Sequence, residues 1–352
     1  MNAKISISVI SSVSCILLLT GLSVSRDKQA ETPFKSPAAW RYSKPLISPE
    51  KRDELPSRAQ KDPTVVFFKG KWHVFMTVKL KGLSAIEYCS FEKWDKAHDS
   101  KRTILRLTDS KYYCAPQVFY FTPHKKWYLI YQLGRPGKRR MQVAFSTTTD
   151  IADPKSWTRA GSVFRNDADD PRTEGGLDYW MICDSKRAYL FITSLNGKMW
   201  RMSARIEDFP HGFGDLALAL RGDIFEASHT YKLSGIDKYL TVIEAKAGSR
   251  RYYKAYLADR LDGKWTEASG GARKPFAGLP NIRPADGVEA WTDNISHGEL
   301  IRKGHDQTLQ VDPQKLRFIF QGALQKDKAG KSYGGIPWRI GMLAPVEQAA
   351  DK

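Results

Sequence analysis

Residues 61–75 read KDPTVVFFKGKWHVF, and this stretch decides the fold class. An apolar run at residues 64–68 is followed by a Lys-Gly-Lys turn and by a second apolar run that starts at Trp72. Such a pattern is typical of a β-hairpin. The charged pair Lys61 and Asp62 lies directly against the first strand, so it is either a solvated strand end or part of a site.

The hairpin pattern recurs along the chain. Each unit has an apolar strand, a short polar turn and a second strand rich in apolar and aromatic residues, and the fifth unit carries an insertion between its strands. The distance along the chain from the start of one unit to the start of the next suits propeller blades of ~40–50 residues with added loops. The sequence therefore predicts an all-β fold, a five-bladed β-propeller, in which the first strand of each blade lines the axis. The five units open at Asp62, Pro116, Asp178, Glu226 and His297.

Composition agrees with this prediction. The 352 residues are 12% aromatic, with 10 Trp and 26 Gly, which suits an aromatic-rich β fold with many turns. Residues 1–25 are predicted to be a signal peptide, residues 26–45 a polar linker with three prolines, residues 46–345 the propeller, and residues 346–352 a tail.

The N-terminus predicts a secreted protein. Lys4 precedes an apolar stretch at residues 5–22, and small residues end at Ser25, near which we expect cleavage. The alternatives are an uncleaved anchor and a lipid attached at Cys15. After cleavage Cys89, Cys114 and Cys183 remain, so at most one disulfide can form and one thiol stays free.

The formal net charge of +18 favours anionic partners. The basic residues are scattered and form no nucleic-acid-binding motif, so nucleic acid is not expected as a partner. An acidic polysaccharide fits a secreted chain better, and a merely solvated basic surface is an equal alternative. No P-loop, HExxH, CxxC or strand-linked GxGxxG motif is present.

Three of the five repeat openers are carboxylates, namely Asp62, Asp178 and Glu226. Acids that converge on one axis repel one another, so their convergence does not stabilise the fold and indicates a catalytic site instead. Strand capping or metal binding is the alternative. Two carboxyl groups suffice for glycoside hydrolysis. Lys61 keeps its neighbour Asp62 ionised and suited to the role of base. The apolar residues before Glu226 favour a protonated acid, which leaves Asp178 as a pKa modulator.

Other side chains are candidates for substrate or ion binding. Trp180 is a candidate for stacking on a sugar ring, with a core position as the alternative. Tyr333 stands in a glycine-containing loop and is the better candidate for sugar contact. His297 is either an ordinary polar residue or a ligand of an axial ion whose other ligands are waters.

Several contiguous motifs identify a family resemblance. They include KDPTVVFFKGKWHVF, CAPQVFYFTPHKKWYLIYQ, DYWMICDS, FEASHTYK, DNISHGE, GHDQTLQVDP and YGGIPWR, in order between Trp40 and Leu343. They resemble the α-L-arabinofuranosidases of glycoside hydrolase family 62. The resemblance implies a secreted five-bladed propeller that removes arabinofuranose side groups from xylan with inversion of configuration.

The resemblance also implies roles for single residues. It makes Asp62 the general base, Asp178 the pKa modulator and Glu226 the general acid. It places Lys61 and Gln117 in the arabinose pocket and implies an axial ion, usually calcium, at His297. No organic cofactor is expected, and we expect a monomer without stable membrane insertion.

Two departures from the usual sequence of the family bear on substrate specificity. Gly334 and His305 stand where the family often has Asn and Tyr, and the high basic charge suits a glucuronate-bearing xylan. The competing predictions are a related propeller glycosidase acting on arabinan or another pentosan, and a non-catalytic polysaccharide-binding propeller.

Overall fold

The structure is a computed structural model that describes residues 34–134, 141–164 and 176–346. The predicted signal peptide lies outside the described residues, as do the first part of the predicted linker and most of the predicted tail. Within the described ranges, no helix has the length and apolar character needed to cross a membrane.

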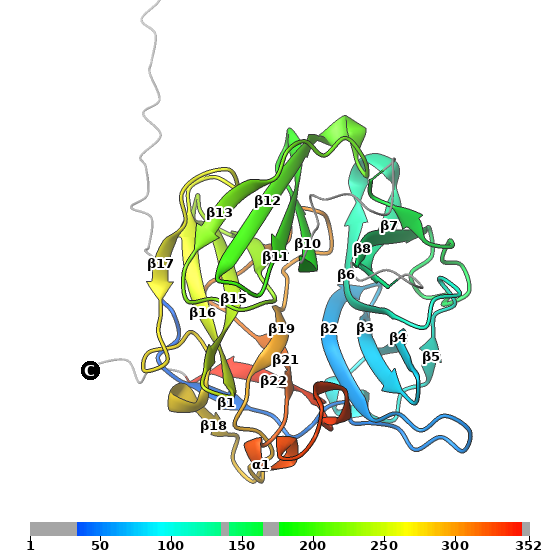
Figure 1. The fold of residues 1–352 in the computed structure, drawn as a ribbon, viewed down its shortest axis with the longest axis vertical. Helices are drawn as coiled ribbons and strands as arrows, with labels where there is room; N and C mark the ends of the chain where they lie inside the picture. Colours follow the sequence, from blue (N-terminus) through cyan, green and yellow to red (C-terminus); the bar gives the residue numbers. More distant parts are fainter. Residues whose placement is uncertain (1–33, 135–140, 165–175, 347–352) are drawn as a thin grey trace, which may run out of the picture. The chain divides into compact units, whose positions relative to one another are not determined.

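Five β-sheets follow one another around a central axis, which confirms the predicted propeller (Figure 1). Blade 1 contains β2 (Ala59–Phe68), β3 (Lys71–Leu80), β4 (Leu83–Phe91) and β5 (Arg102–Ile104). Blade 2 contains β6 (Tyr113–Phe121), β7 (Lys126–Leu133), β8 (Gln142–Thr148) and β9 (Gly161–Ser162). Blade 3 contains β10 (Leu177–Cys183), β11 (Arg187–Thr193), β12 (Lys198–Arg205) and β13 (Ala217–Arg221).

The last two blades each have five strands. Blade 4 contains β14 (His229–Leu233), β15 (Tyr239–Ala247), β16 (Arg250–Ala258), β17 (Thr266–Ser269) and β20 (Gln310–Val311). Blade 5 contains β19 (Ser296–Leu300), β21 (Phe318–Gly322), β22 (Arg339–Pro345), β1 (Trp40–Tyr42) and β18 (Ile282–Pro284). One short helix, α1 (Gln325–Lys328), precedes β22, and single 3-10 turns lie at Trp94–Lys96, Thr122–His124, Ile206–Asp208, Leu279–Asn281 and Tyr333–Gly335.

The opening hairpin has the predicted form. β2 pairs antiparallel with β3, so that Val65 lies opposite Val74. Both side chains are at most 1% exposed, because an inner strand is covered on both faces and therefore consists mainly of apolar residues. Lys61 and Asp62 stand at the beginning of this strand, and the inner strands of the other blades begin at the same end of the axis.

Blade 5 is completed by the N-terminal strand. β1 pairs antiparallel with β22 and parallel with β18. Trp40 and Tyr42 are buried while Arg41 is exposed, the alternation of a half-buried strand. The propeller therefore begins within the segment that we predicted as a linker, before residue 46.

The insertion in the fifth unit covers the far end of the axis. Its carbonyl groups at His305 and Gln307 accept hydrogen bonds from the backbone N–H groups of Tyr120 (2.7 Å) and Cys183 (2.9 Å). Its next residues form β20, which joins β14 of blade 4. The ring of His305 is partly buried and packs against Phe68 and other aromatic rings there, so this departure lies outside the pocket that the three predicted acids line.

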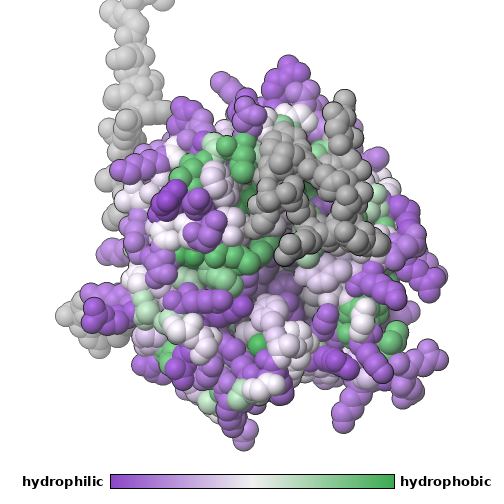
Figure 2. Space-filling model, viewed as in Figure 1, coloured by the Kyte–Doolittle hydropathy of each residue, from purple (hydrophilic) through white to green (hydrophobic). Residues whose placement is uncertain are grey.

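Cys89, Cys114 and Cys183 are buried free thiols, so none of the three is in a disulfide. The described surface seen in Figure 2 is largely hydrophilic, with apolar patches in the region of β12, β13 and β15 and a smaller one near β4 and β5. Packing of large side chains in the core therefore stabilises the fold, and none of these three cysteines adds a disulfide.

Candidate active site

Three carboxyl side chains meet where the inner strands begin. Asp62 lies in β2, Asp178 lies in β10, and Glu226 lies just before β14. All three are buried and line one pocket of about 320 Å³, together with Lys61 and Tyr333. The convergence of the acids that the repeats predicted is therefore present in the structure.

A left-handed backbone residue stands at the same place in every blade. In four inner strands the ladder register shifts at this residue, as at a β-bulge, and a bulge re-aims the neighbouring side chains. For an L residue this conformation costs about 1–2 kcal/mol, so the surrounding fold must stabilise it. The five residues are Asp62 (φ 48°), Ala115 (φ 51°), Asp178 (φ 53°), Ala227 (φ 54°) and His297 (φ 22°).

Asp62 is surrounded by positive and polar groups. Its carboxylate lies 3.6 Å from Lys61 Nζ and 3.4 Å from His297 Nδ1, and its backbone N–H donates to Gln321 Oε1 at 2.8 Å. Burial raises the pKa of Asp62, but the charges of Lys61 and His297, together with hydrogen bonds from Thr77 and Lys61, bring the pKa below its usual value. Asp62 is therefore ionised at neutral pH, as we predicted from Lys61.

Glu226 has the opposite electrostatic setting. Burial, followed by the negative charge of Glu244, raises the pKa of Glu226 to about 7, although Arg251 acts to lower it. One guanidinium nitrogen of Arg251 contacts both carboxylates. A protonated fraction of Glu226 is therefore available near neutral pH.

Asp178 links the other two acids. One of its oxygens accepts the backbone N–H of Ala227 at 3.0 Å, and the other lies 3.8 Å from His297 Nδ1. Burial and then the charges of Glu226 and Asp62 raise the pKa of Asp178 well above its usual value. Repulsion within the group thus disfavours full ionisation of the three acids.

Lys61 and Tyr333 form a wall of the pocket. Lys61 Nζ lies 4.5 Å from the centre of the Tyr333 ring, and the guanidinium of Arg251 lies 5.1 Å from it. Two cations beside one aromatic ring hold that ring in place. Tyr333 remains 42% exposed and therefore accessible to a ligand.

The model of glycosyl hydrolase family 62 matches residues 40–344. This chain belongs to that family. It is 34% identical over 316 residues to α-L-arabinofuranosidase C of Cellvibrio japonicus (strain Ueda107), covering 88% of this chain and 47% of that protein. The chain thus spans less than half the length of this curated relative.

Solved structures of family 62 have the same fold. The catalytic domain of the Coprinopsis cinerea GH62 α-L-arabinofuranosidase superposes with a TM-score of 0.80 at 34% identity, over 88% of this chain and 98% of that one. A GH62 hydrolase in complex with xylotriose superposes with a TM-score of 0.80 at 30% identity, with the same coverage of both chains.

Gln117 does not lie where the family-62 resemblance led us to expect it. Its side chain is fully buried and is not among the described residues that line the pocket. The amide nitrogen donates to the backbone carbonyl of Met181 at 2.6 Å, and the amide oxygen accepts the Met181 N–H at 2.7 Å. The structure therefore makes Gln117 a link between blades 2 and 3 rather than a sugar contact.

Trp180 is a core residue, so the prediction of sugar stacking is wrong for this side chain. It is 2% exposed and stacks on His229 with ring centres 4.1 Å apart. Its indole N–H donates to the carbonyl of Thr230 at 2.9 Å. Both polar and apolar surfaces of the ring are thus occupied by blade 4.

The calcium ion implied by the resemblance fits the described residues poorly. Within the described ranges, no three or more His, Cys, Asp or Glu side chains are grouped to hold a metal ion. His297 directs Nδ1 at the carboxylates of Asp62 and Asp178. Calcium prefers six to eight oxygen ligands, so a cation beside this imidazole would depend almost entirely on water.

Two residues of the family-62 site were missed by sequence reasoning. Glu244 is fully buried and, with Arg251, forms the charged cluster behind Glu226. A charge within the apolar run at residues 240–245 was a signal for Glu244, because a fully buried carboxylate needs a partner. Arg251 follows Arg250 in a turn and strand of scattered basic residues, and its sequence context carried no such signal.

Proposed function

We propose that this chain is an inverting exo-α-L-arabinofuranosidase that removes arabinofuranosyl side groups from arabinoxylan as a monomer. Membership of family 62 and the identity to an α-L-arabinofuranosidase support the reaction. The related hydrolase in complex with xylotriose supports a xylan backbone as the carrier of the arabinose.

The observation that carries the proposal is the opposite pKa shift of two carboxyl groups in one pocket. The pKa of Asp62 is lowered and the pKa of Glu226 is raised to about 7. At neutral pH Asp62 is therefore ionised and Glu226 is partly protonated, beside Asp178, whose pKa is also raised. Glycoside hydrolysis requires this combination of base and acid.

In the proposed reaction Asp62 takes a proton from a water molecule while the water oxygen bonds to the anomeric carbon of arabinose. Glu226 donates its proton to the departing xylose oxygen as the bond from that oxygen to the anomeric carbon breaks. Attack from the face opposite the leaving group inverts the anomeric configuration. Exchange with solvent then removes the proton from Asp62 and restores one to Glu226.

Asp178 positions and tunes the acid in this proposal. It accepts the N–H of Ala227, the residue next to Glu226, and so fixes the backbone that carries the acid. Repulsion by Glu226 and Asp62 adds to burial in raising the pKa of Asp178, so ionisation of either Asp178 or Glu226 disfavours ionisation of the other. Lys61 and Tyr333 line the pocket and would contact the arabinose unit.

The test is arabinose release from arabinoxylan by the parent protein and by Glu226→Gln. Glu289→Gln is the matched control, since Glu289 is exposed and outside the pocket. We expect release by the parent and the control, and a loss in Glu226→Gln of about 10²–10⁴-fold, the usual contribution of a general acid. Early NMR spectra should show arabinose with inverted anomeric configuration.

Other results would redirect the proposal. Release from arabinan but not from arabinoxylan would favour the related pentosan glycosidase. Binding of arabinoxylan without release would favour the non-catalytic propeller, and retained configuration would contradict the roles of Asp62 and Glu226.

We also propose that the enzyme is secreted. The basic and apolar N-terminus with small residues up to Ser25 supports this localisation. N-terminal sequencing of the extracellular protein should give a start near residue 26, and an intact N-terminus in the cell fraction would contradict secretion.

A further inference from the structure

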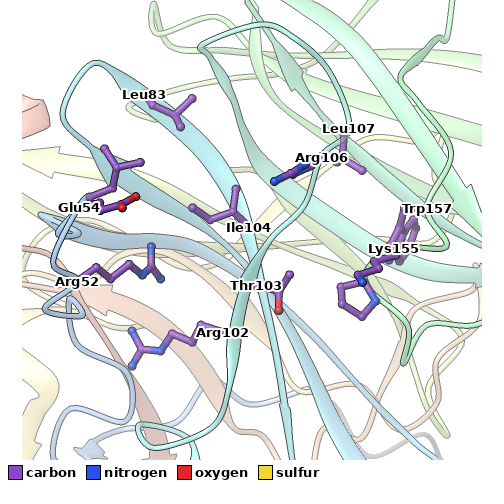
Figure 3. Close-up of a pocket in the computed structure, with 12 residues that line it drawn as sticks. Arg52, Glu54, Leu83, Arg102, Thr103, Ile104, Arg106, Leu107, Lys155 and Trp157 are labelled. Carbon is purple, nitrogen blue, oxygen red and sulfur yellow. The ribbon is translucent and has the colours of Figure 1, made fainter.

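A second cavity lies at the outer edge of blade 1. It has a volume of about 1100 Å³. Its lining residues are Arg52, Glu54, Leu55, Leu83, residues 102–104 of β5 with Arg106 and Leu107 after it, and Pro154, Lys155 and Trp157 of blade 2. Figure 3 shows Thr103 and Ile104 between three arginine side chains and, across from them, Lys155 and Trp157. We call this cavity the rim groove. It shares no lining residue with the active-site pocket.

The rim groove is positively charged. Four of its lining residues are cations, whereas Glu54 is the one carboxylate among its described lining residues. Arg52 is neutralised by Glu87 and Glu50 behind it. The groove thus has three further cations against one carboxylate, and these are Arg102, Arg106 and Lys155.

The side chains of these three cations differ in how freely they can move. Arg102 is held in place, because its guanidinium donates to the backbone carbonyls of Ser48 at 2.7 Å and His98 at 3.0 Å. Arg106 and Lys155 are exposed, so their charged ends can adjust to a ligand. A fixed arginine and two adjustable cations along one groove are suited to binding the carboxylates of an acidic polymer.

Three groove-lining side chains also carry a buried N–H group without a hydrogen-bond partner in the described part of the chain. They are Arg52 Nη1, Arg102 Nε and Trp157 Nε1. Buried donors are normally paired, and an unpaired one costs about 1–3 kcal/mol. All three atoms are buried inside the wall of the groove, so a ligand in the groove would meet the exposed ends of the cations rather than these N–H groups.

The rest of the lining is apolar. Leu83, Ile104 and Leu107 contribute side chains, and Leu55 at the rim is 44% exposed. Ligand sites commonly combine such apolar surface with a few polar groups that fix orientation. Sugar rings present C–H faces as well as hydroxyl groups, so an acidic saccharide matches both the apolar and the cationic parts of the groove.

The rim groove lies near the active site. Leu107 lines the groove and Tyr112 lines the active-site pocket. Five residues of chain separate their Cα atoms by at most about 18 Å. One polysaccharide chain can therefore contact both places.

We propose that the rim groove binds a uronic-acid-bearing segment of polysaccharide, with Arg102, Arg106 and Lys155 as the cations along the groove that attract its carboxylates. The choice of a xylan as the polymer rests on the proposed function, whereas the acidic character of the ligand rests on the groove alone. Bound there, the acidic segment would hold the polymer beside the active-site pocket.

The test uses a glucuronoxylan that carries no arabinose, so that binding is measured apart from turnover. Its carboxyl-reduced form is the neutral control polymer. Affinity electrophoresis of the full protein in gels that contain either polymer should show stronger retardation by the acidic one. Added salt should reduce the difference, because exposed charges are screened.

The double variant Arg106→Gln/Lys155→Gln should lose this preference, with affinity for the acidic polymer reduced on the order of fivefold, as expected for exposed ion pairs. Arg221→Gln/Lys264→Gln removes the same charge from exposed positions in blades 3 and 4 and should keep the preference. Melting temperatures of both variants check that each is folded.

Equal retardation by the two polymers, or equal losses in the two double variants, would overturn the proposal. Equal retention by single-stranded DNA would show general cation–anion attraction and would also overturn it. Arabinose release from arabinoxylan, measured on the same samples, reports separately on the proposed function.

Discussion

Glu244 accepts a hydrogen bond from the backbone N–H of His297 at 2.8 Å, although the two residues belong to neighbouring blades. The same carboxylate accepts the hydroxyl of Ser296 at 2.9 Å and contacts Arg251, which also contacts Glu226. One buried side chain thus connects the left-handed corner of blade 5 with the proposed acid of blade 4.

The rate of the parent protein should show a bell-shaped dependence on pH. Activity requires ionised Asp62, whose pKa is lowered, and protonated Glu226, whose pKa is raised to about 7. On the acid side, activity should therefore fall only at pH values below the usual pKa of a carboxyl group. On the alkaline side it should fall near pH 7. The measurement is kcat/KM against pH. An alkaline limit far above pH 8 would argue against Glu226 as the acid.

Replacement of Glu244 should shift the alkaline limb of this profile. Burial is the largest cause of the raised Glu226 pKa and the charge of Glu244 is the next. Glu244→Gln removes that charge, so the pKa of Glu226 falls and the alkaline limb moves to lower pH. Glu289→Gln should leave the profile unchanged. A uniform loss of rate at every pH would instead indicate a purely structural role for Glu244.

Replacement of Asp62 should abolish turnover without abolishing binding. Asp62→Asn cannot accept the proton from water, so kcat should fall by about 10²–10⁴-fold. KM should change much less, and Asp215→Asn, at an exposed position, should behave as the parent. Because Lys61 loses its buried partner, urea unfolding should accompany the kinetics to confirm that the variant is folded.

Replacement of Gln117 should affect stability rather than substrate affinity. Gln117→Ala leaves the backbone N–H and carbonyl of Met181 unpaired, so the free energy of unfolding should fall by about 2–4 kcal/mol. Gln314 is exposed, and Gln314→Ala should have no such effect. A raised KM with unchanged urea unfolding would return Gln117 to the sugar pocket.

At the left-handed backbone residue of a blade, substitution by glycine should not lower the stability of the protein. Ala115 has φ 51°, so Ala115→Gly relieves a conformation that costs alanine about 1–2 kcal/mol. Ala144 is fully buried in β8 without a positive φ, and Ala144→Gly should lower the free energy of unfolding by at least roughly 0.5–1 kcal/mol. Thermal or urea unfolding should show that Ala115→Gly is at least as stable as the parent. Equal losses at both positions would contradict the strain.

The repeats allowed the number of blades, the inner strands and the three acids to be predicted, because strand periodicity and repeat position are both local signals. The left-handed corners carry no such signal, since none of the five residues is glycine. Trp180 was misassigned for a related reason: periodicity places a residue on an inner strand, but a bulge decides the direction of its side chain. The prediction for Gln117 came from the family resemblance instead, and its side chain pairs with Met181 of the next blade. Glu244 acts through partners on other strands, which sequence spacing alone does not relate.

The pairing of β1 with β22 has a consequence for how the chain is made. Blade 5 combines Trp40–Tyr42 with Arg339–Pro345, which is synthesised after the strands of all the other blades. Earlier blades can form during synthesis, because their strands are consecutive. The ring itself can close only after β22 has been translated, and until then the edge of β1 must not pair with other strands.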